Sequence, residues 1–383
     1  MTIERGSSLR LLCATQFYSP SVGGMQLSNR LLVEGLASGG AMVDLHVFAG
    51  EHAETEQQGN IRRHDHPIKP KSIMEHFACA NTLIRHAKAL RPDFVLLLDE
   101  GIVRALGFLP FLKKNGLRYV SINSGSTLTR GSRHFRGRVN AGLVRRGYRW
   151  LDLLFVAQST AAVLPEVCPE VADRVRMLGR PVPDSFFTET GKEGGVPVFE
   201  NDLPTLFSCA RAEEEKGIRL VLDALARLRD QSGAEVANFV FAGDGPALMS
   251  WRRMAQELSL SQIRFVGRLS LEELIPYYRS CYMCIFPAHG VIETFGRVWM
   301  EAFACGKPAI STTTDNLKYL VSDGNNSIAI EPEVGSICNG IRQALSLSQA
   351  DYWKMSRRAR EMALPYSQTA IVNNLLYILK DIK

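Results

Sequence analysis

Short apolar runs alternate with amphipathic stretches along the first half of the chain. The runs at 9–15, 43–49 and 92–98 predict buried strands, because each is short, apolar and bounded by turn residues. Further strands are expected within 116–123 and 151–159, and the stretches between the runs carry apolar residues at helical spacing. Strands that alternate with helices in this way indicate a parallel sheet covered on both faces.

The same alternation resumes after a segment of different composition. Residues 182–203 are rich in proline, glycine and charge, which is typical of a linker. Beyond it, helical stretches alternate with strands predicted at 205–210, 237–246, 263–269, 282–288 and 308–313. A chain of 383 residues is too long for one compact core. The predicted fold class is therefore α/β, with two doubly wound Rossmann-like domains that face each other across a cleft.

Composition favours a cytoplasmic protein. Apolar residues make up 46% of the chain and charged residues 22%, as in ordinary globular domains. No apolar run reaches the roughly 18 residues that span a bilayer, and the first residues lack the apolar core of a signal peptide. The eight cysteines are scattered, which fits a reducing compartment. We expect a cytoplasmic location, with peripheral contact at the inner face of the membrane as an open alternative.

Two short motifs raise the question of a metal or redox site. Cys281 and Cys284 form a CxxC in an apolar run without a second pair. We interpret them as part of a buried strand rather than as a redox or zinc site. The segment His64-Asp65-His66 is polar and has no further ligand at a useful spacing, so we interpret it as a solvated loop. No metal site is predicted.

Positive charge is concentrated in one segment. The net charge is +6, and residues 113–150 contain no Asp or Glu. The ten cations there are Lys113, Lys114, Arg118, Arg130, Arg133, Arg136, Arg138, Arg145, Arg146 and Arg149. Such a segment favours an anionic partner, but it lacks the interleaved aromatic residues of a single-strand nucleic-acid platform. A solvated basic face and contact with anionic lipid headgroups or a phosphorylated acceptor both stay open.

Glycine turns follow two of the predicted strands. Gly23 and Gly24 come after the first strand and just before a helix. Glycines at this point let backbone N–H groups approach a phosphate, and the helix N-terminus adds positive potential. Gly243 lies in a GDGP turn that ends a later strand. A purely structural turn is the alternative interpretation at both places.

Two cations follow the strand predicted at 205–210. Arg211 and Lys216 lie directly after it. Fixed cations at the carboxyl end of a parallel strand suit a diphosphate, because the guanidinium forks onto two oxygens and the ammonium acts as a point charge. Residues 213–215 between them are all glutamate, so a local ion-pair network is the alternative.

The strongest signal is a pair of glutamates around a predicted helix start. Glu293 and Glu301 are eight residues apart, with Phe295 and Gly296 between them. A helix that begins near Gly296 presents N–H groups that bind anions, and Glu301 lies roughly 7 Å further along it. Glu293 can then accept from sugar hydroxyls and Glu301 from ribose hydroxyls, on either side of a diphosphate. The alternative is an acidic residue that favours the helix dipole plus a surface glutamate.

Several segments resemble the family 4 glycosyltransferases, which have the GT-B fold. They are 208–217 (SCARAEEEKG), 241–246 (FAGDGP), 265–269 (FVGRL) and 293–308 (ETFGRVWMEAFACGKP), together with 17–26 (FYSPSVGGMQ), which resembles the family's donor-phosphate loop. The resemblance implies an acceptor-binding domain at 1–185 and a nucleotide-sugar-binding domain at 186–365. It also implies that a terminal helix within 366–383 packs back on the first domain.

The resemblance implies a retaining hexosyl- or N-acetylhexosaminyl-transferase of cell-surface polysaccharide or glycolipid synthesis. It takes a UDP- or GDP-sugar as donor, needs no metal or other cofactor, and has a glycan, glycolipid or small molecule as acceptor. The residues that match its catalytic positions are Arg211, Lys216 and Glu293, of which the cations stabilise the leaving diphosphate. Those that match its donor-binding positions are Gly23, Gly24, Arg211, Lys216, Gly243, Gly267, Glu293, Thr294, Phe295, Gly296, Arg297, Val298 and Glu301.

Three places depart from the family's pattern. Asn123 stands where the family often has a histidine near the donor sugar, and Lys318 stands near the place of a glutamate. Residues 179–182 read GRPV where the family often has Asn-Gly-Val-Asp. The first and the second leave the donor sugar open, and with it whether Asn123 replaces the histidine. They do not remove the diphosphate site.

Several other functions are alternatives to a glycosyltransferase of glycan or glycolipid synthesis. A transferase for a small soluble acceptor and a non-catalytic relative that binds nucleotide or a partner protein both stay open. The altered positions 123 and 318 favour the non-catalytic relative. An epimerase or a phosphorylase of the same double-domain fold lacks a recognisable motif here. A nicotinamide dehydrogenase is disfavoured because no GxGxxG follows the first strand, and no nucleic-acid partner is expected.

Overall fold

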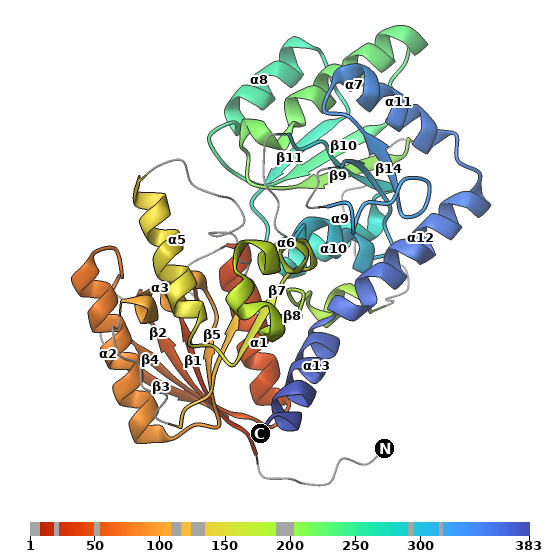
Figure 1. Cartoon of the computed structure of the whole chain (residues 1–383). Helices are drawn as coiled ribbons and strands as arrows, with labels where there is room; N and C mark the ends of the chain where they lie inside the picture. Colours follow the sequence, from red (N-terminus) through yellow and green to blue (C-terminus); the bar gives the residue numbers. More distant parts are fainter. Residues whose placement is uncertain are drawn as a thin grey trace. The chain divides into compact units, whose positions relative to one another are not determined.

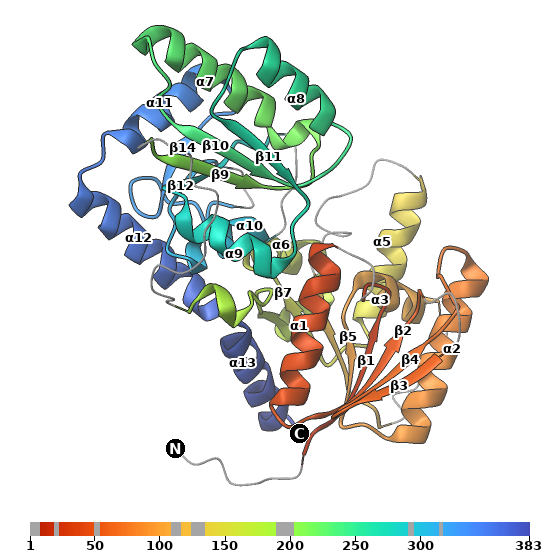
Figure 2. The same cartoon turned by 180° about the vertical axis from the view of Figure 1, so that it is seen from behind.

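The computed structural model divides the chain into two compact units (Figures 1 and 2). Unit 1 comprises Met1–Pro181 and Gln368–Lys383, and unit 2 comprises Val182–Ser367. The residues that the structure describes are 8–18, 23–49, 54–108, 116–123, 135–188, 203–289, 295–313 and 317–383. The boundaries predicted from the sequence lie a few residues away from those of the units.

Unit 1 is built on an eight-stranded sheet with the order β3-β4-β2-β1-β5-β6-β7-β8. The strands are β1 Arg10–Thr15, β2 Met42–Val47, β3 Glu54–Gln58, β4 Ile61–Asp65, β5 Phe94–Leu97, β6 Tyr119–Ile122, β7 Leu153–Val156 and β8 Val175–Met177. β3 and β4 pair antiparallel, and the other neighbours pair in parallel. The direction in which strands are added reverses between β1 and β5, so the switch point of unit 1 lies at their carboxyl ends.

Helices cover both faces of this sheet. They are α1 Gly24–Ser38, α2 Ile73–Leu90, α3 Glu100–Gly107, α5 Phe135–Tyr148, α6 Gln158–Val167 and α13 Gln368–Asp381. Alternate residues of β1 belong to two separate cores: Leu11 packs with α1 and α13, and Leu12 with the helices of the other face. This division follows from the two-residue period of a strand.

The last helix belongs to unit 1. Figures 1 and 2 both show α13 beside α1, and the contact depends on small residues of α1. A methyl group on Gly35 would lie 2.5 Å from Val372, and one on Gly39 would lie 2.6 Å from Leu376. Lys383 adds an ion pair to Asp93, with 2.9 Å between Nζ and Oδ1. The chain therefore returns to unit 1 after it has completed unit 2.

Unit 2 contains a six-stranded sheet with the order β11-β10-β9-β12-β13-β14. The strands are β9 Thr205–Cys209, β10 Asn238–Ala242, β11 Ile263–Gly267, β12 Met283–Phe286, β13 Ala309–Thr312 and β14 Ser327–Ile330, and all neighbours pair in parallel. Numbered along the unit, this is the 3-2-1-4-5-6 order of a Rossmann fold, whose switch point lies between β9 and β12. The doubly wound α/β prediction is confirmed for both units.

Two sets of helices enclose the sheet of unit 2. They are α7 Ile218–Ser232, α8 Leu248–Glu257, α9 Leu271–Ser280, α10 Arg297–Ala304, α11 Val334–Leu345 and α12 Gln349–Ala363. Leu206 and Phe207 of β9 are both fully buried, yet they belong to opposite cores. The first packs with α7, α8 and α11, and the second with α9, α10 and α12. No helix within the described ranges is long and apolar enough to cross a membrane.

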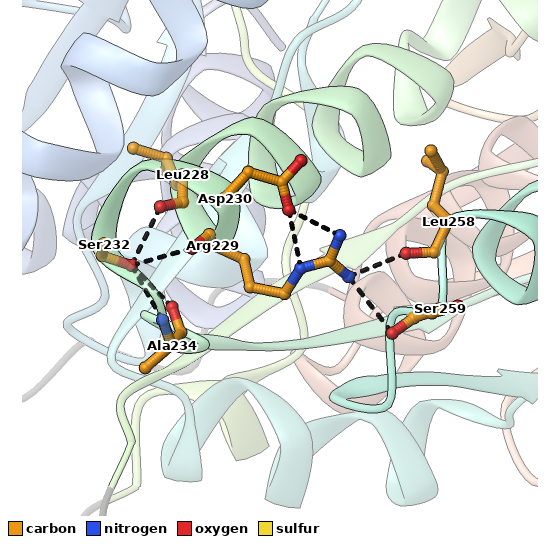
Figure 3. Close-up of polar contacts among 7 residues, drawn as sticks. All are labelled: Leu228, Arg229, Asp230, Ser232, Ala234, Leu258 and Ser259. Carbon is orange, nitrogen blue, oxygen red and sulfur yellow. Dashed lines mark hydrogen bonds and ion pairs between the residues drawn. The ribbon is translucent and has the colours of Figure 1, made fainter.

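The end of α7 is held by polar contacts (Figure 3). Gly233 follows the helix in the left-handed conformation, and its N–H donates to the carbonyl of Arg229 at 2.8 Å. The Arg229 guanidinium donates in turn to the carbonyls of Leu258 at 2.7 Å and Ser259 at 3.2 Å, beyond the end of α8. The helix therefore ends at the glycine that the sequence marks.

Several elements were not predicted. The segment 64–66 is not a solvated loop, because His64 and Asp65 belong to strand β4, which pairs with β2 on one side and β3 on the other. A pattern of apolar residues cannot reveal this β3–β4 hairpin, because the residues of β3 are all exposed and polar. Three further elements were not predicted from the sequence: β14, α11 and α12, which lie between the last predicted strand and the terminal helix.

Candidate functional site

Loops that follow β9, β10 and β12 meet at the switch point of unit 2. The N–H of Ala212, after β9, donates to the carbonyl of Asp244, after β10, at 2.9 Å. The N–H of His289, after β12, donates to the carbonyl of Glu215 at 2.8 Å. These bonds tie the three loops together at the edge of the sheet where ligands of doubly wound folds bind.

A glycine allows the loop after β9 and the loop after β10 to pack closely against each other. Gly243 directly follows β10 and has a φ of 148°. A Cβ atom on it would lie 1.8 Å from the carbonyl oxygen of Ala210. No residue with a side chain fits at this position, so Gly243 serves the packing of the two loops. Its predicted role in donor binding stays a prediction, as does that of Gly267 at the end of β11.

Arg211 and Lys216 lie in the loop after β9, as the strand prediction implies. The side chain of Arg211 is 70% exposed, and its Nε lies 3.2 Å from Oε1 of Glu213. The local ion pair that the sequence left open is therefore present for Arg211. Exposed pairs of this kind contribute little free energy, so an anionic ligand can displace the glutamate. Lys216 ends a short 3-10 helix at Glu214–Lys216 and is half-buried.

Helix α10 begins where the glutamate motif predicts. Gly296 is its N-cap with a φ of 71°, and a Cβ atom there would lie 2.8 Å from Leu320 and 2.9 Å from Leu317. Gly296 has no side chain with which to cap the helix, and first-turn N–H groups that no side chain caps are the ones that bind anions. Phe295 is buried, and Arg297 and Val298 are half-buried. Glu293 and Thr294 lie outside the described residues.

Glu301 is held within the core rather than at the surface. It is 3% exposed. Its Oε1 accepts from Nε of Arg297 at 2.7 Å, and its Oε2 accepts from the hydroxyl of Tyr278 at 3.1 Å. Burial, followed by the charge of Glu301, raises the pKa of Cys209 at the end of β9. Each carboxylate oxygen has a second lone pair, so these bonds orient Glu301 and leave it able to accept from a ligand.

Tyr278 of α9 is a component of this site that the sequence did not reveal. It is fully buried, and burial together with the negative charge of Glu301 holds the pKa of its phenol well above the usual range. The phenol therefore keeps its proton and donates to the carboxylate. In the sequence Tyr278 is one aromatic residue in an apolar helical stretch, with no signal of its partner.

A polar cavity lies at the switch point of unit 1. It measures about 220 Å³, and its polar lining residues are Gln16, Asp99, Glu100, Arg104, Asn123 and Arg180. Asp99 is buried, and its carboxylate accepts from the N–H of Gln16 at 2.7 Å and from the hydroxyl of Thr15 at 3.0 Å. The amide nitrogen Nε2 of Gln16 is buried and has no partner among the described residues. The cavity thus offers unused hydrogen-bonding capacity.

The other predicted positions of unit 1 are Gly23, Gly24 and Asn123. Gly23 is the N-cap of α1 in extended backbone, and Gly24 is the first residue of the helix. Asn123 directly follows β6 and lines the cavity, where its Nδ2 donates to Ser121 at 2.7 Å and its Oδ1 accepts from Tyr148 at 3.1 Å. In unit 2, Lys318 is exposed.

Part of the basic segment is neutralised by an acid from elsewhere. Within its described portion, Arg145 of α5 and Arg149 just beyond it lie 2.6 and 3.2 Å from Oε1 of Glu170. These contacts lower the pKa of Glu170 to about 2, chiefly through the hydrogen bond from Arg145. Residues 113–115 and 124–134 of the segment lie outside the described part of the chain. Two of the ten cations are therefore paired with a carboxylate, and the choice between a solvated basic face and an anionic partner stays open.

Cys284 lies in a buried strand, as predicted, whereas Cys281 lies just before it, at the end of α9. β12 runs from Met283 to Phe286 with every residue buried. Cys281 and Cys284 are both buried free thiols with 3.8 Å between their sulfur atoms.

Solved structures with the same architecture are glycosyltransferases of the GT-B fold. Sucrose-phosphate synthase from Thermosynechococcus elongatus matches with a TM-score of 0.77 and 17% identity, covering 98% of this chain and 99% of that one. HepE of Anabaena, solved in complex with UDP, matches with a TM-score of 0.74 and 15% identity over 97% and 100% of the two chains. The fold of this protein is therefore GT-B.

Sequence comparison finds a family match within unit 2. Residues 194–362 match the family described as "Glycosyl transferases group 1". The uncharacterized glycosyltransferase MJ1178 of Methanocaldococcus jannaschii is 31% identical over 117 residues, 30% of this chain and 31% of its own. D-inositol 3-phosphate glycosyltransferase of Corynebacterium jeikeium is 31% identical over 186 residues, 47% of this chain and 42% of its own. The matched region thus spans less than half the length of these two relatives.

Proposed function

We propose that the protein is a retaining glycosyltransferase that moves a hexose-type sugar from a UDP- or GDP-sugar to an acceptor hydroxyl without a metal ion. One observation carries the proposal. The N-terminus of α10 and the cation Arg211 belong to the carboxyl-end loops of a Rossmann sheet, in a segment that matches the glycosyl transferases group 1 family. A diphosphate is the ligand that this combination of N–H groups and fixed cations suits best.

The chemistry follows from where charge develops. In the proposed reaction the bond between the anomeric carbon and the diphosphate oxygen breaks, and a bond from the acceptor oxygen to the same face of that carbon forms. The acceptor proton passes to the leaving phosphate. Arg211, Lys216 and the first N–H groups of α10 stabilise the negative charge that grows on the diphosphate. Glu301, oriented by Arg297 and Tyr278, accepts from the ribose hydroxyls.

The acceptor is assigned to unit 1. Its polar cavity at the β1–β5 switch point contains carboxylates, guanidinium groups and Nε2 of Gln16, which has no partner within the described ranges. Together these groups suit a ligand rich in hydroxyl or phosphate groups. Relatives named alpha-monoglucosyldiacylglycerol synthase and lipopolysaccharide core biosynthesis glycosyltransferase support a role in glycolipid or cell-surface glycan synthesis. The relative named D-inositol 3-phosphate glycosyltransferase supports a small soluble acceptor.

A donor panel tests the proposal. The full chain is incubated in EDTA with UDP- and GDP-sugars and with diacylglycerol, lipopolysaccharide core and inositol phosphate as acceptors. Release of free nucleotide is measured, and the anomeric configuration of any product is determined by NMR. Transfer with retained configuration supports the proposal. Transfer with inverted configuration contradicts the retaining mechanism, and nucleotide binding without any transfer favours the non-catalytic alternative.

A membrane-bound acceptor has its own test. The exposed cations of α5, of which Arg138 and Arg146 are examples, support binding to anionic lipid. Co-sedimentation with phosphatidylglycerol vesicles but not with phosphatidylcholine vesicles is expected. Equal binding to both would contradict this part of the proposal.

A further inference from the structure

Histidines from three elements of unit 1 gather at one place. The parallel register of β2 and β4 sets His46 directly beside His64. Alternate residues of a strand point to the same face, so His66, two residues beyond His64, lies on that face too. His86 comes from α2, and its ring lies 4.6 Å from that of His46, centroid to centroid. The sequence spacing does not reveal the cluster, because His46, His66 and His86 follow one another at intervals of twenty residues.

The ring nitrogens are close enough to share one cation. One nitrogen each from His46, His66 and His86 lies within 4.8 Å of the other two. Nδ1 of His46 and Nε2 of His66 are already 2.9 Å apart. Two metal–nitrogen bonds of roughly 2.0–2.1 Å at a tetrahedral angle place their nitrogens about 3.3 Å apart. Small rotations of the rings are therefore sufficient to close the cluster on an ion.

The cluster also contains polar atoms that its own contacts do not satisfy. His46 is fully buried, and its Nε2 has no hydrogen-bond partner among the described residues. A buried ring nitrogen without a partner costs free energy, whereas a ring that binds a metal through Nδ1 can donate its Nε2–H to an outer acceptor.

A carboxylate lies beside the rings. Oδ1 of Asp44, on β2, is buried and lies 3.6 Å from Nε2 of His64. His64 in turn stacks on the ring of His46, with 4.7 Å between the ring centroids, so the Asp44 carboxylate places a negative charge next to the cluster. Without a metal, the cluster would be a group of stacked rings in which His66 also lies on Phe48, with ring centroids 4.7 Å apart.

We propose that His46, His66 and His86 bind a divalent transition-metal ion of the zinc class, with His64 and the carboxylate of Asp44 beside the site. Imidazole ligands favour zinc, copper and nickel over magnesium or calcium. The ion would hold the β3–β4 hairpin at the sheet edge to β2 and to α2, so its role is structural. The proposal concerns unit 1 alone and does not depend on the proposed transfer reaction. It also replaces the expectation, drawn from 64–66 alone, that this region holds no metal site.

The test is zinc binding by the full chain without a histidine tag. The protein is treated with EDTA, exchanged into buffer, and titrated with Zn²⁺ against a chromophoric chelator, and its thermal midpoint is recorded with and without the ion. One ion per chain and a higher midpoint are expected. Co²⁺ in the same site should give the visible absorption of tetrahedral coordination.

Variants distinguish the cluster from other sites. His86→Ala and His66→Ala are chosen because both side chains are only partly buried, unlike His46. Each removes a ligand and should weaken Zn²⁺ binding by more than roughly 100-fold. Loss of an outer partner alone costs about 10- to 100-fold. His76→Ala, on the same helix α2 but outside the cluster, is the matched control. Sub-stoichiometric binding, or equal binding by wild type and His86→Ala, would overturn the proposal.

Discussion

Replacement of Gly296 by alanine should destabilise unit 2 through two separable costs. The left-handed backbone at a φ of 71° costs a non-glycine residue about 1–2 kcal/mol. The added methyl group would lie 2.8 Å from Leu320 and 2.9 Å from Leu317, both buried, and such overpacking costs about 1–3 kcal/mol. The total is about 2–5 kcal/mol, which is a large part of the stability of a domain.

Thermal unfolding measures this cost. For a unit of this size, 1 kcal/mol shifts the midpoint by about 2–4 °C, so Gly296→Ala should lower the midpoint of unit 2 by about 4–20 °C. The variant should also weaken nucleotide binding, because the methyl group displaces the first turn of α10, where the diphosphate is proposed to bind.

Two glycines separate the two costs. Gly233 has a φ of 76° but open space where a Cβ would be, so Gly233→Ala should show the backbone cost alone. Gly335 in α11 has neither a positive φ nor a close neighbour, and Gly335→Ala should stabilise by about 0.5–1 kcal/mol. If Gly296→Ala lowers the midpoint no more than Gly233→Ala does, the packing at the start of α10 is not as described.

Three further predictions concern charge. Lys216→Ala and Glu293→Ala should each reduce turnover by roughly 100-fold or more in a nucleotide-release assay. This is the scale of the loss of one preorganised charge contact. Full activity of either variant would show that the site is misplaced. Glu301→Gln should mainly weaken nucleotide affinity in calorimetry, because the carboxylate is the proposed ribose ligand, and unchanged affinity would remove that role. Glu170 has a pKa lowered from 4.5 to about 2, so the stability it contributes is present above pH 4.5 and lost as the pH falls towards 2. Chemical denaturation should show a steeper loss of stability over that range for wild type than for Glu170→Gln, and parallel curves would refute the link to Arg145.

The positions around Gly296 could be predicted because their signals are local. A helix start, a glycine and a glutamate five residues further on are contiguous in sequence, and α10 begins at Arg297 accordingly. The strands of both cores were likewise visible as apolar runs, of which Leu206 and Phe207 are typical.

The contacts that orient the site depend on pairing that no local pattern contains. Tyr278 reaches Glu301 only because α9 and α10 pack on the same face of the sheet. His46 and His64 become neighbours only through the register of β2 with β4, and β4 itself lacks a hydrophobic alternation. Long-range pairing of this kind is set by the assembled sheet, so its polar consequences appear only in the structure.

Calorimetric titration with UDP and GDP in EDTA tests the central claim most directly. The account predicts metal-independent binding of one nucleotide to the wild-type protein and weaker binding to the Lys216→Ala variant, because the ammonium would contact the diphosphate. Absence of binding by the wild type, or equal affinity in the two proteins, would contradict a diphosphate site at the carboxyl ends of β9 and β12.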